Sequence, residues 1–134
     1  MREILFRAKR DKNYCDTQEW TYGVPFIDHE GDCIFKTASS ERVVDPKTVG
    51  QYTGLTVNGT RIFEGDIVKF GNIIGIINYS TGCYCVKTNK PDWRNRNNPA
   101  IDIVINEYPN EIEIIGNIHD NPELLVGREK HEDH

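Results

Sequence analysis

The chain of 134 residues is 37% hydrophobic and 28% charged, which suits one domain or two small subdomains that share a core. No run approaches the roughly 20 apolar residues of a membrane span, and residues 1–7 lack the apolar run of a signal peptide. We therefore expect a cytoplasmic protein with no membrane partner. The net charge of −5 argues against a general nucleic-acid coat but leaves room for a local basic patch.

The N-terminal third carries one aromatic cluster and two turn signals. Residues 28–32 predict a turn, and Asp45 before Pro46 predicts one helical turn, because Asp caps helices and Pro suits their first position. The aromatic residues of this third are expected to lie in the core: Tyr14, Trp20, Tyr22 and Phe26.

A hairpin is predicted around Asn58-Gly59, because a type I′ turn needs positive φ at both central residues. Its strands are expected at residues 51–57 and 60–63. Gly65 is expected to take a positive φ at the next turn, where the Asp66 side chain can hydrogen-bond backbone amides two residues on.

The rest of the chain is dominated by a hydrophobic period of two, which is typical of strands. Gly75 marks a bend or a close backbone approach in a central strand. Asn121-Pro122 predicts a second helical turn, and residues 127–134 should fray because they lack apolar side chains. Strands are predicted at residues 66–70, 72–79, 83–88, 101–106 and 111–118.

The four cysteines, Cys15, Cys33, Cys83 and Cys85, should be thiols in a reducing cytosol. Cys83-x-Cys85 together with His29-x3-Cys33 would make a Cys3His set for zinc. Zinc sites usually use Cys-x2–4-Cys knuckles, and a flat strand holds residues 83 and 85 too far apart to wrap an ion. We therefore predict structural thiols and no metal site.

A catalytic nucleophile would need Cys or Ser beside His and an orienting acid. The sequence contains no Gly-x-Ser-x-Gly elbow and no phosphate-cradling glycine loop. Glu64 and Asp66 could form a carboxylate pair, but acids in a turn before a strand commonly serve the turn alone. We predict that the protein is not an enzyme, with no catalytic residue and no cofactor.

The polar segment at residues 87–98 is a candidate nucleic-acid contact. Its cations could neutralise phosphates while its tryptophan stacks on a base. The alternative interpretation is a solvated loop whose tryptophan caps the end of a barrel. The candidate contact residues are Lys87, Lys90, Trp93, Arg94 and Arg96.

Four segments resemble the YopX-like proteins of phages and prophages, in the order of that family and over nearly the whole chain. Residues 11–43 and 80–105, which include all four cysteines and the basic loop, do not carry the match. The matching segments are "ILFRAKR" at 4–10, "VDPKTVGQYTGL" at 44–55, "IFEGDIVKF" at 62–70 and "EIEIIGNIHDNPELL" at 111–125.

The resemblance implies a phage or prophage gene expressed in the bacterial cytoplasm, from a family of uncharacterised proteins. The fold it implies agrees with the period of two: mainly β, of small-barrel (Src-homology-3-like) character, with additional strands and one or two short helical turns. We expect one domain over residues 1–126, with a possible N-terminal subdomain, 1–50, packed on a barrel, 51–118, and a flexible tail at 127–134. The residues of the central signature are expected to be structural: Gly50, Gln51, Tyr52, Gly54, Glu64, Gly65 and Asp66.

The expected function is that of an accessory protein which works by binding, to itself and to a host or phage protein. Small β domains expose strand edges and aromatic side chains, which are common routes to self-association. The alternative is a nucleic-acid-binding barrel that uses the loop at residues 87–96.

Overall fold

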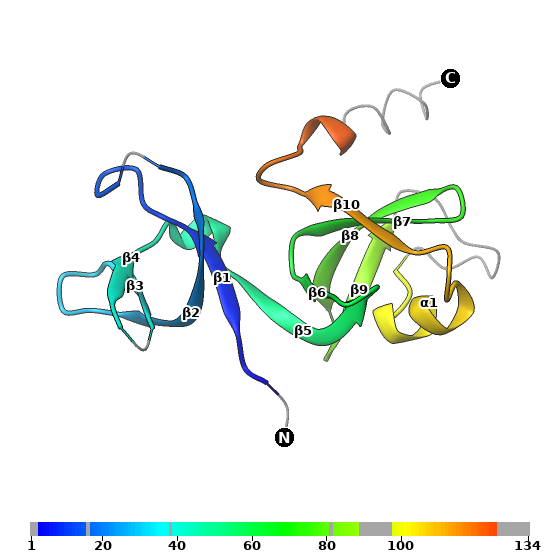
Figure 1. Cartoon of the computed structure of the whole chain (residues 1–134), viewed down its shortest axis with the longest axis horizontal. Coiled ribbons are helices and arrows are strands. Elements are labelled where there is room, and N and C mark those ends of the chain that lie inside the picture. The colour runs from blue at the N-terminus through cyan, green and yellow to red at the C-terminus, as the bar shows by residue number, and fades with distance from the viewer. Residues whose placement is uncertain (1–2, 16, 38, 81, 89–97, 126–134) are drawn as a thin grey trace. The chain divides into compact units, whose positions relative to one another are not determined.

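The computed structural model describes residues 3–15, 17–37, 39–80, 82–88 and 98–125 (Figure 1). They belong to two compact units, Met1–Gly54 and Leu55–His134. The predicted mainly β class is confirmed, because the strands build two antiparallel sheets and helices are few. Within the described residues, neither sheet closes on itself through its hydrogen-bond ladders.

The first sheet has the order β4-β3-β2-β1-β5-β6 and the second has the order β10-β7-β8-β9. Strand β5 begins in the first unit and ends in the second. The elements are β1 (Phe6–Lys9), β2 (Trp20–Ile27), β3 (Cys33–Lys36), β4 (Glu41–Val43), the 3-10 turn η1 (Pro46–Thr48), β5 (Gly50–Val57), β6 (Thr60–Phe63), β7 (Asp66–Phe70), β8 (Ile73–Ser80), β9 (Cys83–Thr88), α1 (Ile101–Glu107) and β10 (Glu113–Asn117).

The predicted hairpin is confirmed, because Asn58 and Gly59 both have positive φ, 52° and 82°, between β5 and β6. The meander that follows is also confirmed, with β7, β8 and β9 within two residues of their predicted bounds. Gly75 lies on β8 where a Cβ atom would collide with the Val86 side chain and lie 3.0 Å from the Lys87 carbonyl oxygen of the neighbouring strand. The close backbone approach that this glycine predicted is therefore present.

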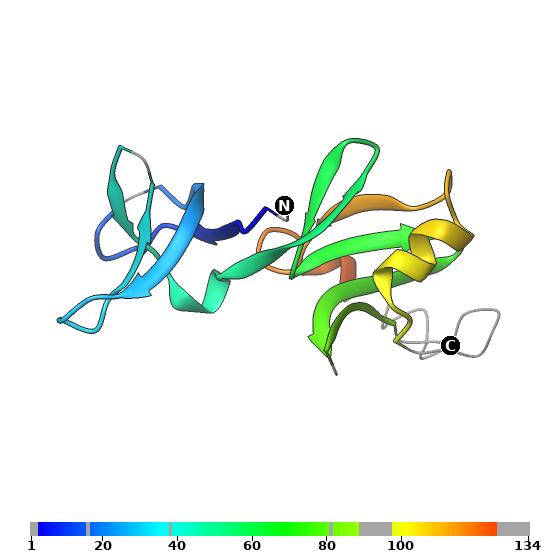
Figure 2. The same cartoon turned by 90° about the horizontal axis from the view of Figure 1, so that it is seen from below.

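The strand predicted at residues 101–106 is wrong, because this segment forms α1. Its apolar residues fit the spacing of a strand and also the spacing of a helix. The buried ones, Ile101 and Val104, are three residues apart on one helical face. Val104 and Tyr108 continue that face, where the Tyr108 ring packs edge-on against Phe70 at 5.0 Å between centroids. Helix α1 lies beside β9 (Figure 2).

The core of the second unit joins the β5–β6 hairpin, the four-stranded sheet and α1. Strand β10 confirms the strand predicted at residues 111–118, although a bulge between Ile114 and Gly116 shifts its register against β7. The buried residues of this core are Val57, Ile62, Val68, Phe70, Ile77, Val86, Ile101, Val104 and Ile112.

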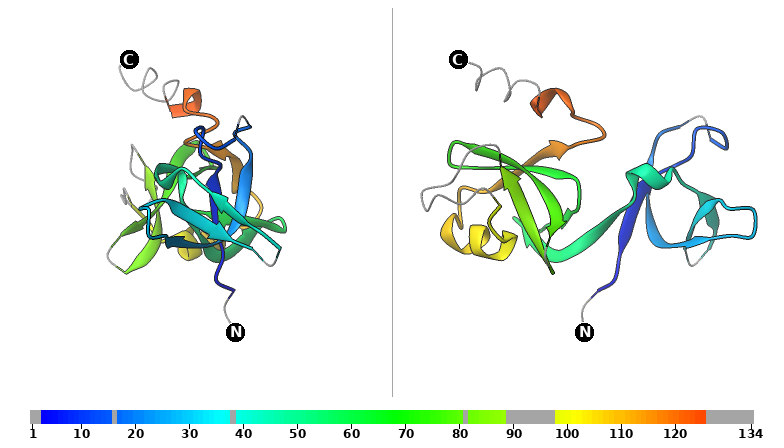
Figure 3. Two further views of the ribbon diagram at one scale, coloured as in Figure 1. Left: turned by 90° about the vertical axis from the view of Figure 1, so that its left-hand side faces the viewer. Right: turned by 180° about the vertical axis from the view of Figure 1, so that it is seen from behind.

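The core of the first unit is smaller, with Ala8, Cys33, Phe35 and Val44 buried together. The turn η1 lies beside β1 (Figure 3) and is tied to it by two hydrogen bonds. The Lys9 amide donates to Thr48 Oγ1 at 2.8 Å, and the Asp45 amide donates to the Lys9 carbonyl at 2.9 Å. The helical turn predicted there is confirmed, and Asp45 caps it by accepting from the Lys47 amide.

Near the C-terminus, the amides of Leu124 and Leu125 donate to the carbonyls of Asn121 and Pro122, at 3.1 Å each. These bonds begin the second predicted helical turn, and residues 123–125 are helical. The tail predicted at residues 127–134 lies outside the described residues.

The N-terminal aromatic cluster is not core, which corrects the prediction. Tyr14, Tyr22 and Phe26 are 58%, 48% and 39% exposed, and Trp20 is half-buried. The core of the first unit lies on the other face of the sheet. Phe35 pairs with Pro25, and Ala8 pairs with Thr21, so the core residues share a face with the odd-numbered residues of β2.

Candidate functional site

One face of β2 exposes a row of apolar side chains. Tyr22, Val24 and Phe26 alternate along the strand and are 48%, 51% and 39% exposed. Isolated apolar residues on a surface are ordinary, but three in a row on one strand form a patch of the kind that binds partners. We call Tyr22, Val24 and Phe26 the β2 face.

Charged side chains border the β2 face. The Arg7 guanidinium carbon lies 4.6 Å from the centre of the Trp20 ring, and the Lys9 ammonium lies 5.5 Å from it. On the other side, Lys36 of β3 pairs with Val24, and Glu41 of β4 pairs with Lys36. The rim of the face therefore carries both signs of charge.

Strand β2 also changes partner along its length. Its residues 20–23 pair with β1 and its residues 24–27 pair with β3. Gly23 marks the change, because a Cβ atom there would lie 2.9 Å from the Lys36 carbonyl oxygen. Tyr22 and Phe26 were predicted as core residues and Val24 was not singled out. The alternation of Trp20, Tyr22, Val24 and Phe26 is nevertheless a signal for a strand with one apolar face.

The basic loop that the sequence singled out falls almost entirely outside the described residues. Lys87 is exposed near the end of β9. Lys90, Trp93, Arg94 and Arg96 lie in the part of the chain that is not described. Nucleic-acid contact by this loop stays a prediction.

The first half of the central signature lies in β5. Gly50 and Gln51 pair with Arg7 and Phe6 of β1. Tyr52 is 7% exposed, and its amide donates to the Leu5 carbonyl at 2.8 Å. Gly54 has a φ of 90° inside the strand, at the boundary of the two units.

The second half of the signature is the turn between β6 and β7. Gly65 has a φ of 89°, as predicted. Asp66 is 3% exposed, and its Oδ2 accepts from the Phe63 amide at 2.8 Å. This bond is to an amide three residues back, a partner that the sequence did not predict, and the expected bond to amides two residues on stays a prediction. Glu64 lies in the same turn, half-buried.

The cysteines and His29 do not gather into a metal site within the described parts of either unit. In the first unit the His29 side chain is 90% exposed, whereas Cys33 is buried and its burial raises the pKa of its thiol. In the second unit, the Cys83 and Cys85 sulfurs on β9 are 3.2 Å apart, so the expectation that the strand holds them too far apart is wrong. The described residues supply no third Cys, His or carboxylate ligand beside them.

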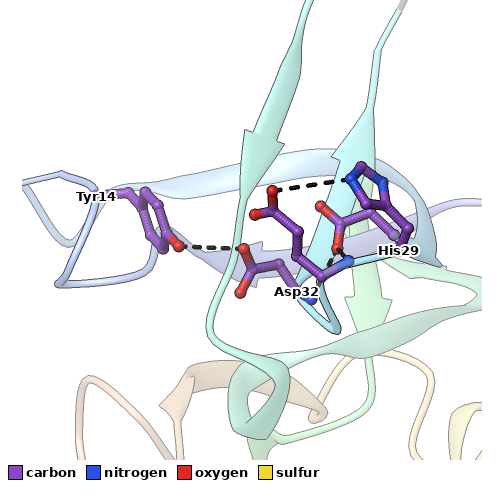
Figure 4. Close-up of polar contacts among 5 residues, drawn as sticks. Tyr14, His29 and Asp32 are labelled. Atoms are coloured by element: carbon purple, nitrogen blue, oxygen red, sulfur yellow. Dashed lines mark hydrogen bonds and ion pairs between the residues drawn. The ribbon is translucent and has the colours of Figure 1, made fainter.

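A carboxylate cluster does form in the turn between β2 and β3, where ligand atoms of Asp28, Glu30 and Asp32 lie within 4.8 Å of one another (Figure 4). Asp28 Oδ1 accepts from the amides of Glu30 and Asp32, at 3.0 and 2.9 Å. Asp32 accepts from the Tyr14 hydroxyl at 3.1 Å, and this bond and the charge of Asp32 raise the pKa of Tyr14. These bonds give two of the acids a role in shaping the turn.

Comparison with known families gives one match, to a family model described as YopX protein, over residues 5–126. No curated protein matches the chain. Among the described helices, none has the length and apolar character needed to cross a membrane.

Proposed function

The chain belongs to the YopX protein family, and we propose that it is a non-enzymatic binding module that pairs with a second copy of itself through the β2 face. The phage or prophage setting, the bacterial cytoplasm and a further host or phage protein partner are parts of the same proposal. The observation that carries it is the exposed row of Tyr22, Val24 and Phe26, on the opposite side of the sheet from the core.

Burial of this row against a partner would be favourable. Removing apolar surface from water contributes about 25 cal/mol per Å², and aromatic side chains contribute the largest areas. Tyrosine and phenylalanine are also enriched in the cores of protein interfaces. The β2 face therefore has the composition of an interface centre.

A second copy is the occupant that fits the shape and charge of the face. If two copies meet about a two-fold axis at Val24, Tyr22 of each lies near Phe26 of the other, so that apolar meets apolar along the whole row. The rim carries Lys36 and Glu41 side by side. A rim with both signs can pair with its own copy, whereas a rim of one sign would repel it.

The proposal also includes the barrel expected at residues 51–118. The β5–β6 hairpin contributes Val57 and Ile62 to the same core as Val68, Phe70 and Ile77 of the four-stranded sheet. We propose that this hairpin and the β7–β9 meander together form a small Src-homology-3-like barrel. In this proposal the barrel is the scaffold, and the β2 face is the binding element.

Sedimentation equilibrium over a concentration series tests the self-association. We expect the unaltered chain to form a dimer and Val24→Glu to weaken the dimer at least tenfold, because a charge at the interface centre must be desolvated. Ile27→Glu is the matched control. Ile27 is on the same strand and 66% exposed, but it lies on the opposite face. A chain that is monomeric at all concentrations, or equal weakening by both variants, would refute the proposal.

Single-stranded nucleic acid is the second candidate occupant, because Arg7 and Lys9 lie over Trp20 beside the β2 face. Stacked aromatic and cationic side chains are the usual elements of a single-strand site. A fluorescent oligonucleotide added to the same samples separates the candidates. Nucleic-acid binding would weaken steeply with salt, and if the predicted loop takes part, Trp93→Ala would reduce it.

A further inference from the structure

Two thiols of the second unit lie in direct contact. Cys83 Sγ and Cys85 Sγ are 3.2 Å apart, within hydrogen-bond distance for sulfur. They occupy alternate positions of β9 and therefore project from the same face of the sheet. Val86, the next residue, projects from the other face into the core of the unit.

The two thiols differ in exposure. Cys83 is exposed at the start of β9, next to the turn that contains Gly82. Cys85 is 3% exposed. The segment before α1 runs along the edge of β9 at this point, since Ala100 pairs with Cys85 and the Val86 amide donates to the Pro99 carbonyl. One sulfur can be reached by a reagent from solution, and the second can be reached only by its neighbour.

We propose that Cys83 and Cys85 form a redox-active dithiol, which low-molecular-weight disulfides such as oxidised glutathione convert reversibly to a disulfide within β9. The Cys83 thiolate attacks one sulfur of the small disulfide, whose S–S bond breaks and releases one thiol. The Cys85 thiolate then attacks the Cys83 sulfur, and the mixed disulfide breaks to release the second thiol. The protein loses two electrons and two protons, and the small disulfide gains them.

The strand geometry makes this disulfide easy to reduce again. Residues two apart on a strand have Cα atoms about 6.6–6.8 Å apart, at the upper limit of the range that disulfides span, about 4.4–6.8 Å. Strained disulfides have more oxidising potentials and are the reversible ones. Gly82, with a φ of 86° in an open turn, lies where the start of β9 could shift to relieve the strain.

The second step should be slow and pH-dependent. Burial raises the pKa of Cys85 to about 11, with smaller contributions from the hydrogen bond and charge of Cys83 and the charge of Asp102. Once Cys83 is in the mixed disulfide its charge is gone, but the burial of Cys85 remains. The thiolate is the attacking form, so the rate of closure should rise about tenfold per pH unit between pH 7 and pH 9.

The test is to treat the full chain with glutathione buffers of increasing oxidised fraction, followed by tryptic digestion and mass spectrometry. Cleavage after Lys69 and Lys87 leaves both thiols in one peptide, residues 70–87, without Cys15 or Cys33. We expect this peptide to lose two hydrogens, and dithiothreitol to restore them. Cys85→Ser should stop at one bound glutathione, with Cys85→Ala as a second variant if serine disturbs the fold. Cys83→Ser should react at least tenfold more slowly.

Cys15 is the matched control, as a partly exposed thiol whose pKa is lowered by its hydrogen bond with Thr17. It should form the mixed disulfide and go no further, and Cys15→Ser should leave the reaction of residues 70–87 unchanged. The proposal is overturned if residues 70–87 keep both hydrogens under conditions that modify Cys15. It is also overturned if Cys83→Ser reacts as fast as the unaltered chain. Neither outcome depends on whether the protein self-associates.

Discussion

Gly65 links three parts of the second unit through its backbone. Its amide donates to the Ile77 carbonyl of β8, and its carbonyl accepts from the Ile118 amide just after β10, at 2.9 Å each. Both bonds require the turn between β6 and β7 to hold Gly65 at a φ of 89°. A side chain would have space there, because the nearest atom to a Cβ would be Ile118 Cγ1 at 3.6 Å. The need for glycine is therefore conformational.

Gly65→Val should lower the free energy of unfolding by roughly 1–3 kcal/mol, because β-branched residues are strained at positive φ. Gly65→Asn should lower it less, because asparagine tolerates positive φ best among residues with side chains. Lys69→Ala, at an exposed position of β7, should stay within about 0.5 kcal/mol. Urea unfolding of the three variants measures this order. Equal midpoints for Gly65→Val and Lys69→Ala would contradict it.

At the residue scale, the structure was predictable from the sequence where one residue decides its own conformation. Asn58, Gly59 and Gly65 predicted their turns correctly, because few other residues adopt positive φ. The partner of a side chain is harder to predict, because it is decided by the path of the chain. The Asp66 carboxylate accepts from the Phe63 amide, three residues back, a partner that the sequence did not predict.

At the scale of elements, the chain was predictable where turns fix the boundaries. The turns at Asn58-Gly59 and Gly65 delimit β5, β6 and β7 within one residue. The segment of β1 to β4 has fewer such signals, and none of its strands was predicted. The aromatic residues of β2, Trp20, Tyr22 and Phe26, were instead predicted to lie in the core with Tyr14, because an apolar side chain looks the same in the sequence whether it is buried or exposed.

Helix α1 shows why a period of two can mislead in a short segment. Ile101, Ile103 and Ile105 alternate as in a strand, but Ile101, Val104, Ile105 and Tyr108 also have helical spacing. Seven residues hold about two helical turns, too few for the sequence to separate the two periods. Packing decides between them, because Val104 is fully buried while Ile103 is 41% exposed.

Two alanine variants separate the helix from the predicted strand. Val104→Ala should cost about 1.5–3 kcal/mol of unfolding free energy, because it leaves a cavity in the core that also contains Phe70 and Val86. Ile103→Ala should be nearly neutral, because the side chain is partly exposed and alanine has the highest helix propensity. Thermal unfolding of both measures the contrast. In a strand with the isoleucines inward the order would reverse, so a larger loss for Ile103→Ala would contradict α1.

At the scale of the whole molecule, the two units hold very different shares of the buried core. Of the nine largest fully buried side chains among the described residues, only Phe35 and Val44 belong to the first unit. The other seven belong to the second unit. Strand β5, with Gly54 at a φ of 90°, is the element that both units share. This unequal division of the core tests the expectation of a single domain with an N-terminal subdomain at residues 1–50.

A fragment of residues 50–134, which keeps all of β5, should fold cooperatively without the rest of the chain, because the described residues of its core lie between Leu55 and Ile114. A fragment of residues 1–54 should not, because a chain of this size needs a larger core than four buried residues to offset its conformational entropy.

Urea unfolding followed by circular dichroism compares the fragments with the full chain. The larger fragment should show a sigmoidal transition with a slope below that of the full chain, because less surface is exposed on unfolding. The smaller should show none. A cooperative transition in residues 1–54 alone, or its absence in residues 50–134, would mean that the units do not divide the stability in this way.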